Sequence, residues 1–153
     1  MTMKTSEQGL AILIDREAAR NDAYQDTKGI WTIGVGHTGP EVHEGLVWTD
    51  DQVRTVFARD IEKYEMSVSN CVTVPLKQHQ FDALVSFAFN CGVNALPHGN
   101  SGAPSSILRA LNAGDYDGAA NAFNNWMADD AVRSRRAGER EQFRGTAFQA
   151  RIK

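Results

Sequence analysis

The chain has 153 residues, of which 42% are hydrophobic and 23% are charged, and its formal net charge is −3 at pH 7. The composition is typical of a soluble globular protein, and the length suits one domain with its own core. No run approaches the roughly 18 apolar residues of a membrane span, and the first residues lack the apolar centre of an export signal. We therefore expect no stable membrane insertion and a cytoplasmic product.

The first element expected is a helix over residues 6–20. Ser6 is its N-cap, and the apolar face of this segment also carries Glu17. Residues 23–38 then change periodicity, because aromatic and β-branched residues are interrupted by three glycines. This pattern predicts a small antiparallel sheet with tight turns.

The rest of the chain is expected to be helical. Thr49-Asp50-Asp51-Gln52 is a capping box that opens a helix, and the mostly apolar run 81–89 predicts the centre of the core. Residues 91–104 are rich in glycine and proline and predict a long loop. Further helices are expected after Ser105, after Asp115 or Asp117, and over about 132–150, with Phe143, Ala147 and Phe148 on the apolar side. These elements predict an α+β fold.

Charge is distributed unevenly along the chain. Residues 133–153 hold seven basic and two acidic side chains, so the remainder is strongly acidic. A basic segment of this kind is either a solvated helix face or a contact for an anionic polymer. We expect no nucleic-acid partner, because the acidic remainder would repel phosphates and no recognition motif is present.

Two carboxylates and a hydroxyl are the strongest chemical signal. Glu17 is followed nine positions later by Asp26 and six positions after that by Thr32. Glycoside hydrolysis needs one acid to protonate the leaving oxygen and one carboxylate to activate water or attack the anomeric carbon. On spacing alone, a helix-end Glu, an Asx-turn Asp and an ordinary strand Thr remain an equally good interpretation.

Longer segments resemble a known family. Glu17 and the run Tyr24-Gln25-Asp26-Thr27-Lys28-Gly29, with Trp31 to Thr38, resemble the signature of the phage lysozymes, the endolysin muramidases of glycoside hydrolase family 24. Residues 81–92 resemble the central helix of that family, residues 106–126 its C-terminal lobe and residues 133–140 its closing helix. The resemblance covers nearly the whole chain.

The resemblance implies both a fold and a reaction. The fold is a single lysozyme-like domain over 1–153: a β-sheet lobe at about 15–50, a linking helix at about 50–67, and a helical lobe at about 70–153 plus the N-terminal helix. The reaction is cleavage of the β-1,4 bond between N-acetylmuramic acid and N-acetylglucosamine in peptidoglycan, with no metal or cofactor. Glu17 is the implied general acid, and Asp26 and Thr32 are implied to position and activate water. The resemblance also favours inversion of configuration at the anomeric carbon.

The resemblance also implies a biological setting. An endolysin without an export signal accumulates in the host cytoplasm and reaches the periplasm and cell wall at lysis through a partner pore, a holin. We expect a monomer. Two alternatives stay open: a lytic transglycosylase acting on the same bond, and a non-catalytic glycan-binding module.

Three further residues are expected near the site. For His37 we favour a structural role that locks the sheet to a helix. Phe89 and Asn90 are expected to line the floor of the cleft, although plain core packing explains Phe89 equally well. The 91–104 loop looks enlarged relative to compact family members.

An arginine of the last helix is expected to pair with Glu17. Arg133 is the first candidate and Arg136 the second. Ala18 replaces the glycine that usually follows the catalytic Glu in this family, and because alanine suits a helix better, we expect altered packing and retained activity. Cys71 and Cys91 are expected to be buried thiols, with a disulfide formed after release as the alternative.

Overall fold

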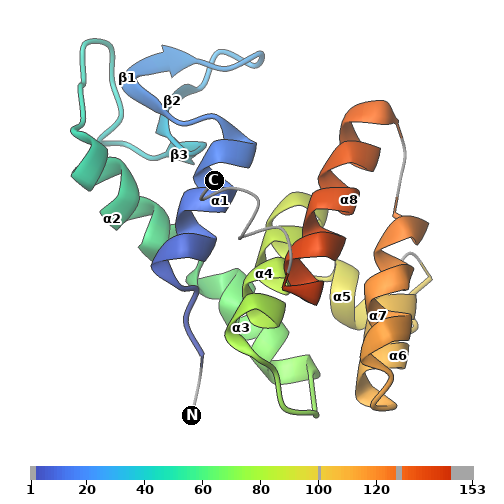
Figure 1. Cartoon of the computed structure of the whole chain (residues 1–153). Coiled ribbons are helices and arrows are strands. Elements are labelled where there is room, and N and C mark those ends of the chain that lie inside the picture. Colours follow the sequence, from blue (N-terminus) through green and yellow to red (C-terminus); the bar gives the residue numbers. More distant parts are fainter. Residues whose placement is uncertain (1–2, 100, 127–128, 146–153) are drawn as a thin grey trace. The chain divides into compact units, whose positions relative to one another are not determined.

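A computed structural model describes residues 3–99, 101–126 and 129–145 (Figure 1). The elements in chain order are α1 (Glu7–Glu17), β1 (Arg20–Gln25), β2 (Trp31–Gly34), β3 (His37–Thr38), α2 (Asp50–Asp60), α3 (Glu62–Cys71), α4 (Gln78–Cys91), α5 (Ala95–His98), α6 (Ser106–Asn112), α7 (Tyr116–Ala122), the 3₁₀ helix η1 (Phe123–Asn125) and α8 (Asp130–Arg144). A small sheet followed by a mainly helical remainder confirms the predicted α+β class.

The chain forms two compact units. The sheet unit runs from Leu10 to Glu62, and the helical unit combines the segment before Leu10 with the chain from Lys63 onward. Most of α1 lies in the unit that also contains the sheet, and only two residues separate the end of α1 from β1.

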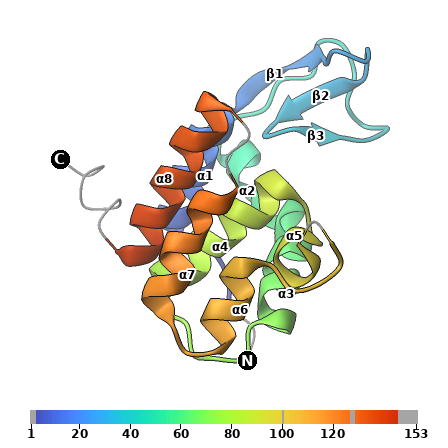
Figure 2. The ribbon, with the colours of Figure 1, turned by 90° about the vertical axis from the view of Figure 1, so that its right-hand side faces the viewer.

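Three antiparallel strands form the sheet in the order β1-β2-β3 (Figure 2). Tyr24 on β1 lies opposite Thr32 on β2, and Ile33 on β2 lies opposite His37 on β3. The predicted antiparallel sheet is confirmed, but it begins at Arg20, three residues before the predicted start at 23.

The end of α1 differs from the prediction. The helix stops at Glu17 and not at residue 20, because Ala18 has a φ of 61°, the left-handed region of backbone space. Its N–H still donates to the carbonyl of Ile14 at 2.9 Å, which closes the last helical turn. The expectation that alanine suits this position is wrong, since the residue lies just outside the helix, where a glycine would be unstrained.

Polar contacts fix the start of α1 within the helical unit. The N–H and hydroxyl of Thr5 both donate to Oε2 of Glu65 at 2.7 Å. Ser6 donates to Asp82 through its N–H (3.1 Å) and hydroxyl (2.5 Å), and its Oγ accepts from the N–H of Gly9 (3.0 Å), which confirms the predicted N-cap. A Cβ at Gly9 would lie 2.5 Å from Cγ of Asp82, so only glycine fits there.

The predicted linking helix is two helices. Thr49 and Gln52 form the predicted capping box at the start of α2, and Val53 and Phe57 are buried on its apolar face. The α-helix is interrupted at Ile61, which is 1% exposed, and α3 then continues to Cys71. The two units divide immediately after this interruption, between Glu62 and Lys63.

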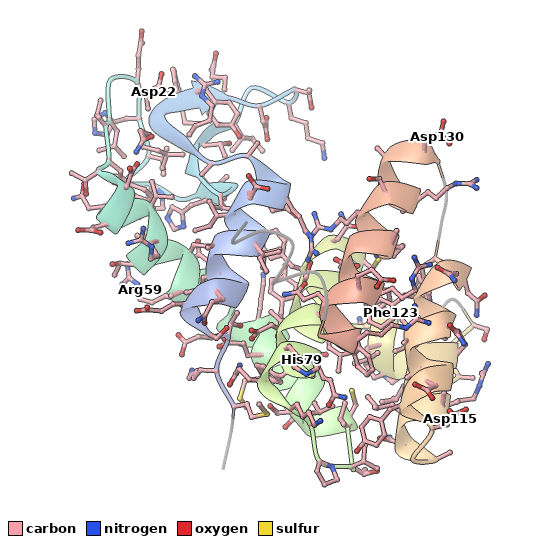
Figure 3. The ribbon with its side chains drawn as sticks, viewed as in Figure 1. Asp22, Arg59, His79, Asp115, Phe123 and Asp130 are labelled. Atoms are coloured by element: carbon pink, nitrogen blue, oxygen red, sulfur yellow. The ribbon has the colours of Figure 1, made fainter. Side chains whose placement is uncertain are left out.

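The core of the helical unit is built on α4. Every residue from Phe81 to Ala88 is buried, which confirms the predicted centre of the core. Helix α8 lies beside α4, and α6 lies beside α7 (Figures 1 and 2). Phe123, labelled in Figure 3, joins these layers because its ring packs against Phe87 of α4 at 5.8 Å and Phe143 of α8 at 5.7 Å.

Two boundaries in this unit differ from the prediction. The segment 91–104 contains the short helix α5, so it is not a continuous loop. Ala95 and Leu96 of this helix are buried, and their packing stabilises a helical turn that the glycine and proline content of the segment did not predict. Helix α8 begins at Asp130 and ends at the left-handed Gly145, and the predicted apolar positions Ala147 and Phe148 lie outside the described residues.

In the part of the chain that the structure describes, no helix has the length and apolarity that crossing a membrane requires.

Candidate active site

Asp26 is held in the tight turn between β1 and β2. Its Oδ1 accepts from the N–H groups of Lys28 (2.8 Å) and Ile30 (2.9 Å), and its own N–H donates to the carbonyl of Ile30 (2.9 Å). Gly29 completes the turn with a φ of 80°. Within the described residues no group bonds to Oδ2 of Asp26. One carboxylate oxygen is therefore fixed by the backbone, and the other is available as an acceptor.

Thr32 is brought to the same place through the same backbone. Its hydroxyl donates to the carbonyl of Ile30 at 2.9 Å, so Ile30 bonds to both Asp26 and Thr32. Thr32 is 4% exposed. Because the hydroxyl hydrogen is already used, the Oγ1 atom is left to accept a hydrogen bond, which suits it to orient a water molecule.

Glu17 is the last residue of α1 and is half-buried. It belongs to the sheet unit, as do Asp26 and Thr32. The predicted carboxylates and hydroxyl therefore come from the end of a helix, a turn and a strand of one compact unit.

His37 joins the sheet to helix α2. Its Nδ1 lies 2.7 Å from Oδ2 of Asp60 on α2, and its Nε2 lies 3.0 Å from Oε1 of Glu41 in the loop after β3. The ring also lies 5.5 Å from that of Trp48. The contact with Asp60 joins β3 to α2 through one side chain.

The charge state of His37 depends on this environment. Burial alone lowers its pKa, but the hydrogen bonds and negative charges of Asp60 and Glu41 outweigh burial and raise the pKa above the ordinary value of 6.5. The protonated ring is thus the form that the fold stabilises.

Phe89 and Asn90 lie near the end of α4, in the helical unit. Phe89 is half-buried, and its ring meets that of Tyr64 edge-on at 5.1 Å, so it is not simply part of the fully buried core. Asn90 is exposed, and its Oδ1 accepts from Nη2 of Arg136 at 2.6 Å.

The two candidate arginines have different environments. Arg133 is 67% exposed and lies 3.9 Å from Asp130, whose labelled side chain projects from the start of α8 in Figure 3. Arg136 is completely buried, and its Nε lies 2.9 Å from Oε1 of Glu139. Pairing of either arginine with Glu17 stays a prediction.

Sequence reasoning missed a buried polar cluster around Glu139. This carboxylate is 0% exposed; it accepts from the hydroxyl of Ser86 (2.5 Å) and Nε of Arg135 (3.1 Å), in addition to its ion pair with Arg136. The available signal was the spacing within one helix, because the two arginines precede Glu139 by four and three positions. Ser86, from another helix, had no sequence signal.

Cys71 and Cys91 are free, half-buried thiols. Burial raises the pKa of Cys71 to about 11. Burial also raises the pKa of Cys91, against the opposing charge of Arg136.

Among the described residues, no group of three or more His, Cys, Asp or Glu side chains could hold a metal ion.

Residues 15–139 match the family model described as phage lysozyme. The chain belongs to the phage lysozyme family. It is 38% identical to the endolysin of Salmonella phage P22 over 149 residues, which cover 92% of this chain and 98% of that one. The matched range contains Glu17, Asp26 and Thr32, so the predicted family resemblance is confirmed.

Solved structures of the family agree in fold. A crystal structure of a P22 lysozyme point mutant matches with a TM-score of 0.84 and 37% identity, covering 92% of this chain and 98% of that one. The muramidase domain of SpmX from Asticaccaulis excentricus matches with a TM-score of 0.77 and 35% identity, over 92% and 97% of the two chains. The lysozyme-like fold implied by the resemblance is therefore confirmed.

Proposed function

We propose that this chain is an endolysin that hydrolyses the β-1,4 bond between N-acetylmuramic acid and N-acetylglucosamine in bacterial peptidoglycan. The observation that carries the proposal is the phage lysozyme match over the range that holds both carboxylates and the threonine. The P22 relative is named an endolysin and the SpmX domain a muramidase, which favours hydrolysis over a lytic transglycosylase or a non-catalytic glycan-binding module.

In the proposed reaction, Glu17 acts as the general acid. Its carboxyl proton passes to the glycosidic oxygen as the bond to the anomeric carbon breaks. A water molecule donates one hydrogen bond to Oγ1 of Thr32 and one to Oδ2 of Asp26, which leaves a lone pair directed at the anomeric carbon. As the new C–O bond forms, the water gives to Asp26 the proton that was hydrogen-bonded to Oδ2, and the product has inverted configuration.

The local geometry supports the role of Asp26 in this proposal. Two backbone N–H groups bind one of its carboxylate oxygens, so the carboxylate cannot rotate without losing both bonds. Thr32 has its hydroxyl hydrogen fixed on the carbonyl of Ile30. Both acceptors for the water are thus oriented before the substrate binds, which reduces the reorganisation that the reaction requires.

We assign His37 a structural role, and we propose that Phe89 and Asn90 contact the glycan. Arg133, the first candidate, would hold the carboxyl of Glu17 in place; Arg136, the second, already contacts Glu139, Asn90 and Cys91. We further propose a monomer that accumulates in the host cytoplasm and passes through a holin pore at lysis. Light scattering should then give the mass of one chain, and rapid lysis should require co-expression of a holin.

Loss of turbidity of outer-membrane-permeabilised cells tests the proposed activity. Glu17→Gln keeps the size of the side chain but removes the acid, so clearing should fall by several orders of magnitude. Glu44→Gln, at an exposed glutamate of the sheet unit, is the matched control and should clear like the wild type. Equal clearing by wild type and Glu17→Gln would contradict the proposed acid.

A further inference from the structure

The environment of Asn90 points to a recognition role. The Oδ1 atom of Asn90 accepts from Nη2 of Arg136 at 2.6 Å and from the thiol of Cys91 at 3.9 Å. An arginine can only donate, which settles which end of the amide faces it. Among the described residues no acceptor bonds to Nδ2 of Asn90, and the residue is exposed.

Arg136 cannot adjust its position easily. It is completely buried, its Nε lies 2.9 Å from Oε1 of Glu139, and its guanidinium stacks over the ring of Phe87 at 5.2 Å. Its Nη1 donates to Sγ of Cys91 at 2.7 Å. Arg136 therefore contacts an opposite charge, an aromatic ring and a thiol at once, and the amide of Asn90 takes its orientation from this support.

Glu139 makes this support stable. A buried guanidinium without a carboxylate is strongly unfavourable, and Glu139, also 0% exposed, supplies the opposite charge. Glu139 is itself oriented by the hydroxyl of Ser86 and by Nε of Arg135. Ser86 and Asn90 lie on α4 and the charged residues on α8, so the network joins the two neighbouring helices.

We propose that Arg136 is a positioning residue, which holds the amide of Asn90 so that its N–H groups donate to an amide carbonyl oxygen of the glycan strand. The inference rests on the proposed function, because peptidoglycan carries such carbonyls in its acetamido groups and in its stem peptides. Because Oδ1 already accepts from Arg136, the amide of Asn90 is left to act as a donor, and the carbonyl oxygens of these groups can only accept.

Steady-state kinetics on soluble peptidoglycan strands test this assignment. Asn90→Ala removes the proposed neutral hydrogen bond to the glycan carbonyl and should raise KM by about three- to tenfold with little change in kcat. Asn90→Asp keeps the shape and the contact with Arg136 but replaces the donor by an acceptor, so its KM should rise at least as much. Asn70→Ala and Asn70→Asp, at an exposed asparagine of the same unit, are the matched controls.

The positioning role needs a separate variant. Arg136→Met combined with Glu139→Leu removes the fully buried ion pair as a unit, and Arg135, which is 12% exposed, keeps its bond to the carbonyl of Ser86. It should raise KM like Asn90→Ala, and adding Asn90→Ala to it should then have no further effect. A normal KM in the double variant would overturn the positioning role, as would full additivity of the two changes. If the double variant does not fold, Asn90→Asp and Asn90→Ala with wild-type KM values overturn the inference by themselves.

Two modified substrates identify the carbonyl. If the acetamido group is bound, the difference between wild type and Asn90→Ala should disappear on N-deacetylated strands. If a stem-peptide carbonyl is bound, it should disappear on strands stripped of their peptides. A difference that persists on both substrates contradicts the inference. A wild-type protein that releases no product at all would instead refute the proposed function, so the two failures are distinguishable.

Discussion

Replacing Ala18 by glycine should stabilise the protein. Ala18 is exposed, has a φ of 61° and follows the last residue of α1. The left-handed conformation costs about 1–2 kcal/mol for a residue with a Cβ, and glycine avoids this cost. Glycine also has more conformational freedom in the unfolded chain, which lowers the free energy of unfolding by about 0.4–1 kcal/mol. The net gain in the free energy of unfolding should be about 0.5–1 kcal/mol, or about 1–4 °C in Tm.

Urea unfolding followed by far-UV circular dichroism measures this change. The matched control is Ala113→Gly, because Ala113 is also an exposed alanine at the end of a helix but has a φ of −84°. There alanine is unstrained, so glycine should lower stability by about 0.4–1 kcal/mol. Opposite signs for the two substitutions support the reasoning. Equal destabilisation by both would refute the strain assigned to Ala18.

Three other substitutions have definite expected outcomes. The raised pKa of His37 means that its stabilising contribution is complete below its ordinary pKa of 6.5 and is lost as pH rises through the higher folded value. His37→Gln should therefore lower the urea midpoint more at about pH 5.5 than at about pH 8.5; the opposite pH dependence would contradict the pairing with Asp60. Thr49→Ala breaks the capping box and should cost about 1 kcal/mol, while Thr49→Ser retains most of it; equal losses would show that the cap is not responsible. Glu139→Leu alone leaves Arg136 buried without its ion-pair partner and should cost about 3–5 kcal/mol, whereas adding Arg136→Met should restore much of the loss; thermal melts showing additive losses would argue against the buried pair.

Local features were predicted well from the sequence. Ser6 and the Thr49–Gln52 box act as caps as predicted, and Ser105 caps the helix expected after it, because a cap depends on residues within three positions of one another. The sheet was visible for a similar reason, since its strands follow one another with tight glycine turns. These features needed no knowledge of tertiary contacts.

The errors arose where tertiary packing or backbone conformation decides. Alanine normally favours a helix, so nothing local marked Ala18 as left-handed. The interruption at Ile61 lies inside an apolar stripe that continues through it, and α5 lies within a segment rich in glycine and proline. The buried network around Glu139 joins residues 53 positions apart, and no spacing rule connects Ser86 with Glu139.

The most direct test of the central claim is mass spectrometry of the muropeptides released from purified peptidoglycan by the wild type and by Asp26→Asn. The proposed hydrolysis predicts products with reducing N-acetylmuramic acid ends from the wild type, and a yield from Asp26→Asn that is lower by orders of magnitude, because the water loses its base. Anhydro-muramic ends would contradict hydrolysis, and an unchanged yield from Asp26→Asn would contradict the role of Asp26.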